Sequence, residues 1–278
     1  MIIDAHAHVF RPAAISPRGT DILAPADRDA PVSALLSTMD THGVDAAVLV
    51  PLDTHDDYVA EALAAHPGRF TALAVASPGE TVASLRERRA RFPYRGVRAM
   101  WLGDPGTPIA DSPFLPVLRH LAEAGLPLWS YLGPEQLPLL TQAIAAVPDL
   151  VVVLNHLGFT PRDMRADDNL RPWFAEPFPA GVLETLRALA DEPNTHLMCS
   201  GQYAISRATN LAEIVSDLTG RFGASRTLWG SDFPWPAEIP GYQALLDQPK
   251  AVFAEPELAH VLGGTARKLF PGLGNQTP

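Results

Sequence analysis

The chain has 278 residues, of which 47% are hydrophobic and 19% are charged, which is enough for one large core, so we expect a single domain over residues 1–278. The formal net charge is −10, and the 21 lysines and arginines form no basic stripe, which argues against a nucleic-acid partner. The lone cysteine, Cys199, excludes an internal disulfide and fits the cytoplasm that we expect for this protein.

Eight short apolar runs follow one another along the chain, and each is typical of a buried strand. They cover residues 2–7, 46–50, 70–76, 96–101, 127–132, 150–155, 196–201 and 227–232. The first run has no basic start and is too short to cross a membrane, so we expect neither a signal peptide nor a membrane partner. Between the runs, apolar residues three and four positions apart predict amphipathic helices, for example at 32–43, 82–92, 114–125 and 137–148.

Regular alternation of strand and helix predicts a parallel sheet, because its strands are apolar on both faces. Eight such repeats favour closure into a (β/α)₈ TIM barrel, with a doubly wound open sheet as the alternative. The longest insertion between a predicted strand and helix is 160–182. A loop of that length on a barrel is typical of an active site.

Two histidines, His6 and His8, lie on the first predicted strand. Since side chains alternate along a strand, we expect Asp4, His6 and His8 to point into the barrel and Ala5 and Ala7 to face the helices. Two neighbouring imidazoles on one face can bind a single divalent ion. The alternative is a pair of ordinary histidines near a strand end.

His156 and Asp232 follow the sixth and eighth predicted strands. The carboxyl ends of barrel strands meet at one mouth, where barrel enzymes place their chemistry, so both side chains are expected near His8. An aspartate after a strand is also a common cap of the next element, and this alternative stays open for Asp232.

Several larger side chains near strand ends are candidates for substrate binding. Arg98 is the best anchor for a carboxylate, since a guanidinium binds it through a two-pronged fork. Aromatic side chains could wall a flat ring or simply fill the core. The predicted substrate-binding residues are Arg98, Trp101, Trp129, Tyr131, Gln202 and Tyr203.

The segments IDAHAH, GVDAAVLVP, GVRAMW, VVVLNHLG, SGQY, GSDFPW and LGGTARKLF occur in this order along the whole chain. In this order they resemble the amidohydrolase-related family of barrel hydrolases and decarboxylases, and most closely its lactonase-like branch. The resemblance implies a metal or polar centre built from His6, His8, His156 and Asp232. It also implies a planar or cyclic carboxylic substrate.

The fifth strand departs from the two-metal members of that family, since it has Trp129 and Tyr131 where they have a lysine or histidine. We therefore expect at most one divalent ion, zinc or alternatively manganese. His6, His8 and Asp232 would be its core ligands, with His156 as a fourth ligand or as a group that polarises the substrate carbonyl. Some lactonase-like relatives work without a metal, so a metal-free site remains an alternative.

Three functions are compatible with these residues. The first is hydrolysis of a lactone or related cyclic ester, with Asp232 as the base that activates water and His156 stabilising the oxyanion. The second is metal-dependent, non-oxidative decarboxylation of an aromatic or unsaturated acid. The third is a non-catalytic barrel that binds a small ligand. The expected partner is a small carboxylic or lactone molecule, and soluble barrels are commonly homo-oligomers.

Overall fold

The computed structural model describes residues 1–275, except for the side chain of Glu238, so the last three residues of the single domain expected over 1–278 lie outside the described part. All eight predicted strands are present, and the third is divided into two short strands. The strands of the barrel wall are β1 (Ile3–Ala7), β2 (Ala46–Leu49), β3 (Phe70–Ala72), β4 (Ala74–Val75), β5 (Val97–Ala99), β6 (Leu128–Ser130), β7 (Val152–Leu154), β10 (Thr195–Cys199) and β11 (Thr227–Trp229).

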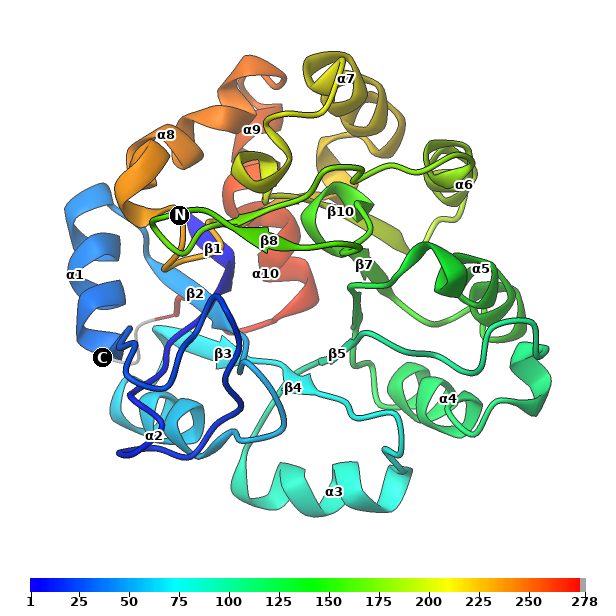
Figure 1. Ribbon diagram of the computed structural model, residues 1–278, viewed down its shortest axis with the longest axis horizontal. Coiled ribbons are helices and arrows are strands. Elements are labelled where there is room, and N and C mark those ends of the chain that lie inside the picture. The colour runs from blue at the N-terminus through cyan, green and yellow to red at the C-terminus, as the bar shows by residue number, and fades with distance from the viewer. Residues whose placement is uncertain (276–278) are drawn as a thin grey trace.

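Helices surround this wall in a ring (Figure 1). The four helices predicted at 32–43, 82–92, 114–125 and 137–148 are confirmed as α1, α3, α4 and α5. The helices are α1 (Val32–His42), α2 (Asp57–Ala65), α3 (Val82–Arg91), α4 (Leu115–Glu123), α5 (Leu137–Ala146), α6 (Val182–Leu189), α7 (Leu211–Phe222), α8 (Tyr242–Asp247), α9 (Glu257–Ala259) and α10 (Thr265–Leu269).

The barrel closes through backbone hydrogen bonds at two places. At the third strand, Leu73 N–H donates to Leu49 of β2, while the next residue, Ala74, donates to Gly96, so the chain changes its partner strand within one residue. Between the first and last strands, Asp232 N–H donates to the His6 carbonyl at 2.8 Å, and Ala7 and Phe233 form a parallel bridge. Neighbouring wall strands are parallel throughout, so the fold is the predicted (β/α)₈ barrel and not an open sheet.

The lower half of the barrel is filled by apolar side chains. Ile3, Val153 and Met198 belong to an inner cluster of apolar side chains. This cluster also contains Ala266 of α10 and Phe270, the residue that follows α10. Because Ile3 starts β1, α10 closes the end of the barrel at which the strands begin. Any site must therefore open at the other end, where the strands stop.

The predicted insertion 160–182 extends over this other end, as Figure 1 shows for the segment with β8. It contains a two-stranded antiparallel ribbon of β8 (Arg165–Ala166) and β9 (Pro172–Trp173). Phe174 N–H donates to the Ala204 carbonyl at 3.0 Å, which fixes the insertion to the loop after β10. No helix within residues 1–275 has the length and apolar character that a membrane crossing needs.

Candidate active site

An irregularity in β1 decides where its histidines point. The pairing of β1 with β2 shifts register between Asp4 and Ala7, as in a β-bulge, which re-aims side chains. Ala5 packs in the inner cluster, whereas the Asp4 carboxylate accepts a hydrogen bond from Tyr242 of α8 at 2.8 Å. The expectation that Asp4 shares the inner face with His6 and that Ala5 faces the helices is therefore wrong, because strict alternation is broken at the bulge.

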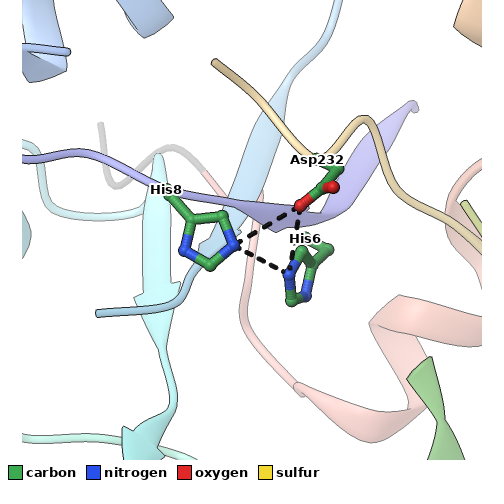
Figure 2. Close-up of side chains that lie close together, drawn as sticks. All are labelled: His6, His8 and Asp232. Carbon is green, nitrogen blue, oxygen red and sulfur yellow. Dashed lines mark hydrogen bonds and ion pairs between the residues drawn. The ribbon is translucent and has the colours of Figure 1, made fainter. Parts of the chain in front are cut away.

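The four residues predicted from separate strand ends meet at one place. Nε2 of His6 lies 3.0 Å from Nε2 of His8. Oδ1 of Asp232 lies 3.6 Å from Nε2 of His6, 3.4 Å from Nε2 of His8 and 3.9 Å from Nε2 of His156. Figure 2 shows His6, His8 and Asp232 pointing toward one another. All four side chains are buried, so they form a compact polar centre inside the barrel mouth.

Three of the four, His6, His8 and Asp232, have the arrangement of a metal-binding group. Their facing atoms form a triangle with sides of 3.0, 3.4 and 3.6 Å, and its centre is about 1.9 Å from each atom, close to a zinc–nitrogen bond. Nδ1 of His8 lies 2.7 Å from the Val50 carbonyl, which can only accept, so Nδ1 carries the hydrogen and Nε2 keeps its lone pair. The three residues fit one divalent ion, and His156 is not part of this group.

Asp232 is fixed by its backbone and by one hydroxyl. It has a left-handed conformation with φ of 62°, which is uncommon outside glycine. Its Oδ2 accepts a hydrogen bond from the Tyr203 hydroxyl at 2.6 Å. Burial raises the pKa of this carboxyl, but His156, His8 and Tyr203 outweigh burial and hold the pKa below its usual value. The carboxylate accepts no backbone N–H from the described residues, so nothing supports the alternative role as a cap.

His156, two residues after the end of β7, also has a left-handed conformation, with φ of 50°. Its Nδ1 lies 2.8 Å from the Ser200 hydroxyl, and its ring stacks on Phe159 at a centroid distance of 5.6 Å. Burial lowers the pKa of His156 to about 4, so the ring is neutral near pH 7. Strained conformations of this kind are concentrated at functional sites.

Arg98 is a buried cation beside this centre. Its guanidinium lies 4.5 Å from the ring centroid of Tyr131, and that ring in turn lies edge-on to His156 at 5.3 Å. Burial lowers the pKa of Arg98. Within residues 1–275, Arg98 forms neither a hydrogen bond nor an ion pair, and its Nε is buried without a partner. The Asp232 carboxylate acts on this cation electrostatically and raises its pKa, but within the described residues no carboxylate forms a hydrogen bond or ion pair with the guanidinium.

Two of the predicted aromatic residues have no described ring contact with the centre. Trp129 is fully buried in the inner cluster, with its ring 5.6 Å from Phe270, because α10 fills the space below it. Trp129 therefore fills the core. The prediction that it binds substrate at the mouth is wrong. Trp101 packs edge-on against Phe114 before α4, and no described ring contact joins it to the centre. Gln202 and Tyr203, in contrast, line the pocket described next.

Two pockets, of about 450 and 420 Å³, flank the centre without including its four residues. Tyr203 lines the first and Trp235 lines the second. Tyr203 holds the central carboxylate, and the Trp235 ring lies 4.9 Å from the ring of His8. Arg171 and Ile239 line both pockets and are joined by a hydrogen bond of 3.3 Å. Each pocket therefore has a lining residue, Tyr203 or Trp235, that contacts a residue of the centre.

Two groups that hold the histidines in place were not among the residues predicted from the sequence. The Val50 carbonyl orients His8, and a backbone atom has no signature in a sequence. Ser200 orients His156 from the end of β10. A serine followed by Gly201 at the end of the predicted strand 196–201 is the one signal that could have suggested a role.

Comparison with known proteins relates this geometry to a family. A family model described as amidohydrolase matches residues 3–272. Among solved structures, the chain is similar to a candidate 2-pyrone-4,6-dicarboxylic acid hydrolase from Pseudomonas putida. Those two chains are 26% identical with a TM-score of 0.74, and the match covers 98% of this chain and 97% of the other.

Two further structures share the fold. An amidohydrolase from Burkholderia multivorans with bound zinc is 22% identical, with a TM-score of 0.74 and coverage of 97% of this chain and 98% of that chain. A 5-carboxyvanillate decarboxylase from Sphingomonas paucimobilis is 18% identical, with a TM-score of 0.61 and the same coverage. No curated protein matches the chain significantly.

Proposed function

The chain belongs to the amidohydrolase family, and we propose that it hydrolyses a lactone or another cyclic ester of a small carboxylic acid. One observation carries this proposal: an ionised, buried carboxylate faces three histidines beside a buried arginine that no carboxylate of the described residues contacts directly. The carboxylate suits a base for water, and the unpaired cation suits a substrate carboxylate. The Pseudomonas putida relative, whose name is that of a hydrolase of a cyclic dicarboxylate, supports the same substrate class.

The residues divide the reaction between them. Asp232 takes a proton from the attacking water and later delivers it to the oxygen that leaves when the ring opens. His156, neutral near pH 7, hydrogen-bonds the carbonyl oxygen as negative charge develops there. His6, His8 and Asp232 would hold a divalent ion, zinc or alternatively manganese, and such an ion would supply Lewis acidity for the activation of water.

Substrate recognition follows from the groups around the centre. Arg98 binds the substrate carboxylate through its free guanidinium, and Tyr131 holds the guanidinium from one face. Tyr203 and Trp235 lie between the centre and the two pockets, where they contact an entering ring. Gln202 lines the first pocket and offers its amide to polar substituents.

The test is a screen of purified protein against lactones and phenolic carboxylic acids, with elemental analysis and chelator treatment in parallel. We expect acid release from a carboxylated lactone, its loss with chelator and its recovery with zinc or manganese. Full activity in metal-free protein would remove the ion from the proposal and leave the hydrolase. Carbon dioxide release from aromatic acids would identify a decarboxylase instead, and a bound but unchanged ligand would identify a binding protein.

A further inference from the structure

Two histidines of the centre have opposite hydrogen-bond environments behind their rings. Nδ1 of His8 faces the Val50 carbonyl at 2.7 Å, and a carbonyl oxygen only accepts. Nδ1 of His156 faces the Ser200 hydroxyl at 2.8 Å, and a hydroxyl both donates and accepts. A neutral imidazole carries one N–H, so Val50 leaves His8 a single tautomer, whereas Ser200 leaves His156 two.

The atoms in front of His156 favour one of these tautomers. Its Nε2 lies 3.9 Å from Oδ1 of Asp232. A carboxylate at this position attracts an N–H and repels the lone pair of an unprotonated nitrogen. The tautomer with hydrogen on Nε2 requires Nδ1 to accept, and the Ser200 hydroxyl is the one described group placed to donate to it.

Ser200 is built closely against the ring. Its side chain is 1% exposed, and His156 is the only described partner of its hydroxyl. The next residue, Gly201, has φ of 71°, and a Cβ placed there would lie 2.9 Å from both Cβ and Nδ1 of His156. Gly201 therefore lets the backbone after β10 approach the ring, which brings the hydroxyl within hydrogen-bonding distance.

We propose that Ser200 is a positioning residue that donates its hydroxyl hydrogen to Nδ1 of His156 and so directs Nε2–H into the centre. This deepens the proposed function, on which its catalytic consequence rests. His156 then serves as a hydrogen-bond donor to the carbonyl oxygen and not as a fourth metal ligand. His8, with the opposite tautomer, offers a lone pair to the ion. The two neighbouring rings are thus assigned different tasks by the groups behind them.

The tautomers are read directly from nitrogen NMR spectra of protein with ¹⁵N-labelled histidine, recorded without ligand and with zinc alone. His156→Gln and His8→Gln identify the signals. We expect hydrogen on Nε2 of His156 and on Nδ1 of His8, and zinc should shift the His8 signals while leaving Nε2 of His156 protonated. Hydrogen on Nδ1 of His156, or loss of its Nε2 hydrogen with zinc, would overturn the proposal.

Variants test the consequence for turnover. Ser200→Ala should lower kcat by about 10- to 100-fold with KM and zinc content little changed, as for other residues that orient a group in contact with substrate. Ser200→Thr keeps the hydroxyl and should retain most of the activity. Ser112→Ala is the matched control, because Ser112 is a buried serine whose hydroxyl bonds the Leu102 carbonyl instead. An unchanged kcat in folded Ser200→Ala would contradict the positioning role.

The two experiments separate this inference from the proposed function. If no lactone is hydrolysed but the spectra show the expected tautomers, the proposed function fails and the role of Ser200 stands. If lactones are hydrolysed and His156 has hydrogen on Nδ1, the proposed hydrolysis stands, whereas the role of Ser200 and the donation from His156 to the carbonyl oxygen fail.

Discussion

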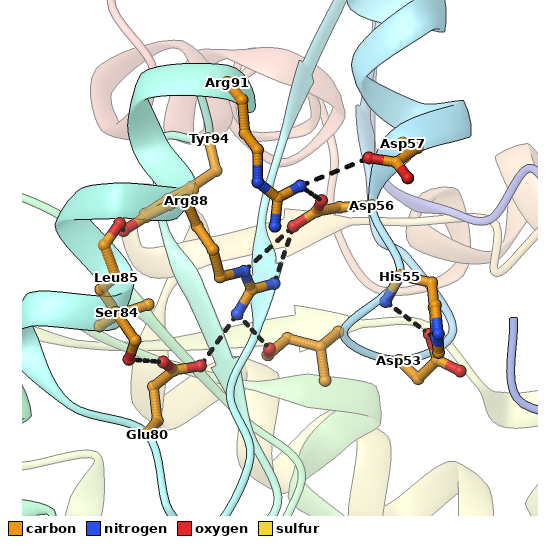
Figure 3. Close-up of polar contacts among 11 residues, drawn as sticks. Asp53, His55, Asp56, Asp57, Glu80, Ser84, Leu85, Arg88, Arg91 and Tyr94 are labelled. Atoms are coloured by element: carbon orange, nitrogen blue, oxygen red, sulfur yellow. Dashed lines mark hydrogen bonds and ion pairs between the residues drawn. The ribbon is translucent and has the colours of Figure 1, made fainter. Parts of the chain in front are cut away.

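Arg88 and Arg98 are equally buried, each 8% exposed, yet their surroundings differ completely. Figure 3 shows Arg88 of α3 between two acids: it donates to Asp56 at 2.9 and 3.1 Å and to Glu80 at 2.9 Å. It also donates to the Val75 carbonyl at 3.0 Å, which ties α3 to the barrel wall. Arg98 of β5 lies against the face of Tyr131, and Asp232 acts on it electrostatically without a hydrogen bond or ion pair.

This difference indicates which buried charges stabilise the fold and which are available to bind a ligand. A buried ion costs several kcal/mol unless partners compensate it. The fold compensates Arg88 through its own carboxylates. Arg98 is attracted by Tyr131 and Asp232 but forms no hydrogen bond or ion pair with a carboxylate of the described residues, and it lies next to the centre where a substrate would supply an anion. Pairing, and not burial, therefore separates the two arginines.

The largest expected effect is a loss of turnover, and it compares two buried aspartates in the same way as the two arginines. Asp232 lies at the centre, and Asp56 belongs to the Arg88 network. Asp232→Asn keeps the shape but removes the charge that accepts a proton, so kcat should fall by about 10²- to 10⁴-fold with little change in melting temperature. Asp56→Asn, the matched control, should lower the melting temperature and leave kcat of the folded protein unchanged. Near-normal turnover of Asp232→Asn would rule out Asp232 as the base.

Arg88→Met would test the structural half of the comparison. It leaves the buried carboxylate of Glu80 without a cation and that of Asp56 with Arg91 alone, so the free energy of unfolding should fall by about 3–5 kcal/mol. Denaturant unfolding followed by circular dichroism measures the change. A loss below 1 kcal/mol would mean that the network does little for the fold.

Asp4 is an intermediate case, since it is buried with partners that are all uncharged. It accepts hydrogen bonds from Ser231 and Tyr242, but burial dominates and raises its pKa from 3.8 to about 6. The folded protein then holds this proton up to a higher pH than the unfolded chain does. Between pH 3.8 and about 6 this group should therefore lower the free energy of unfolding as pH rises, by roughly 2–3 kcal/mol in all.

Unfolding at a series of pH values, with Asp4→Asn as the comparison, isolates this contribution. The variant cannot ionise at residue 4, so its free energy of unfolding should not show this decrease with pH, whereas that of the wild-type protein should. Parallel profiles for the two proteins over this range would show that Asp4 has an ordinary pKa.

The barrel could be predicted from the sequence because its signal is repeated eight times. Apolar runs such as 46–50 and 150–155 have lengths that suit strands, and the segments between them have helical periodicity. The split third strand at Leu73 could not be foreseen, since a change of hydrogen-bond partner within one residue leaves no mark on an apolar run. The same holds for the bulge in β1, which reversed the expected direction of Asp4 and Ala5.

The meeting of the four central residues could be predicted as well, because strand ends of a parallel barrel converge whatever the detailed geometry. What holds them could not. His156 and Asp232 both adopt left-handed backbone conformations, which their residue types do not predict. Trp129 was misplaced because its position depends on α10, which comes from a segment about 140 residues later in the chain.

The most direct test of the difference between the two arginines is Arg98→Met, measured for stability and for turnover of two lactones, one with a carboxylate and one without. The free energy of unfolding should stay the same or rise, because an unpaired buried charge is replaced by an apolar side chain. The ratio kcat/KM should fall by roughly 10- to 100-fold for the carboxylated lactone, the value of a charged hydrogen bond, and stay unchanged for the neutral one. A large loss of stability, or equal losses for the two lactones, would contradict the assignment of Arg98 to the substrate carboxylate.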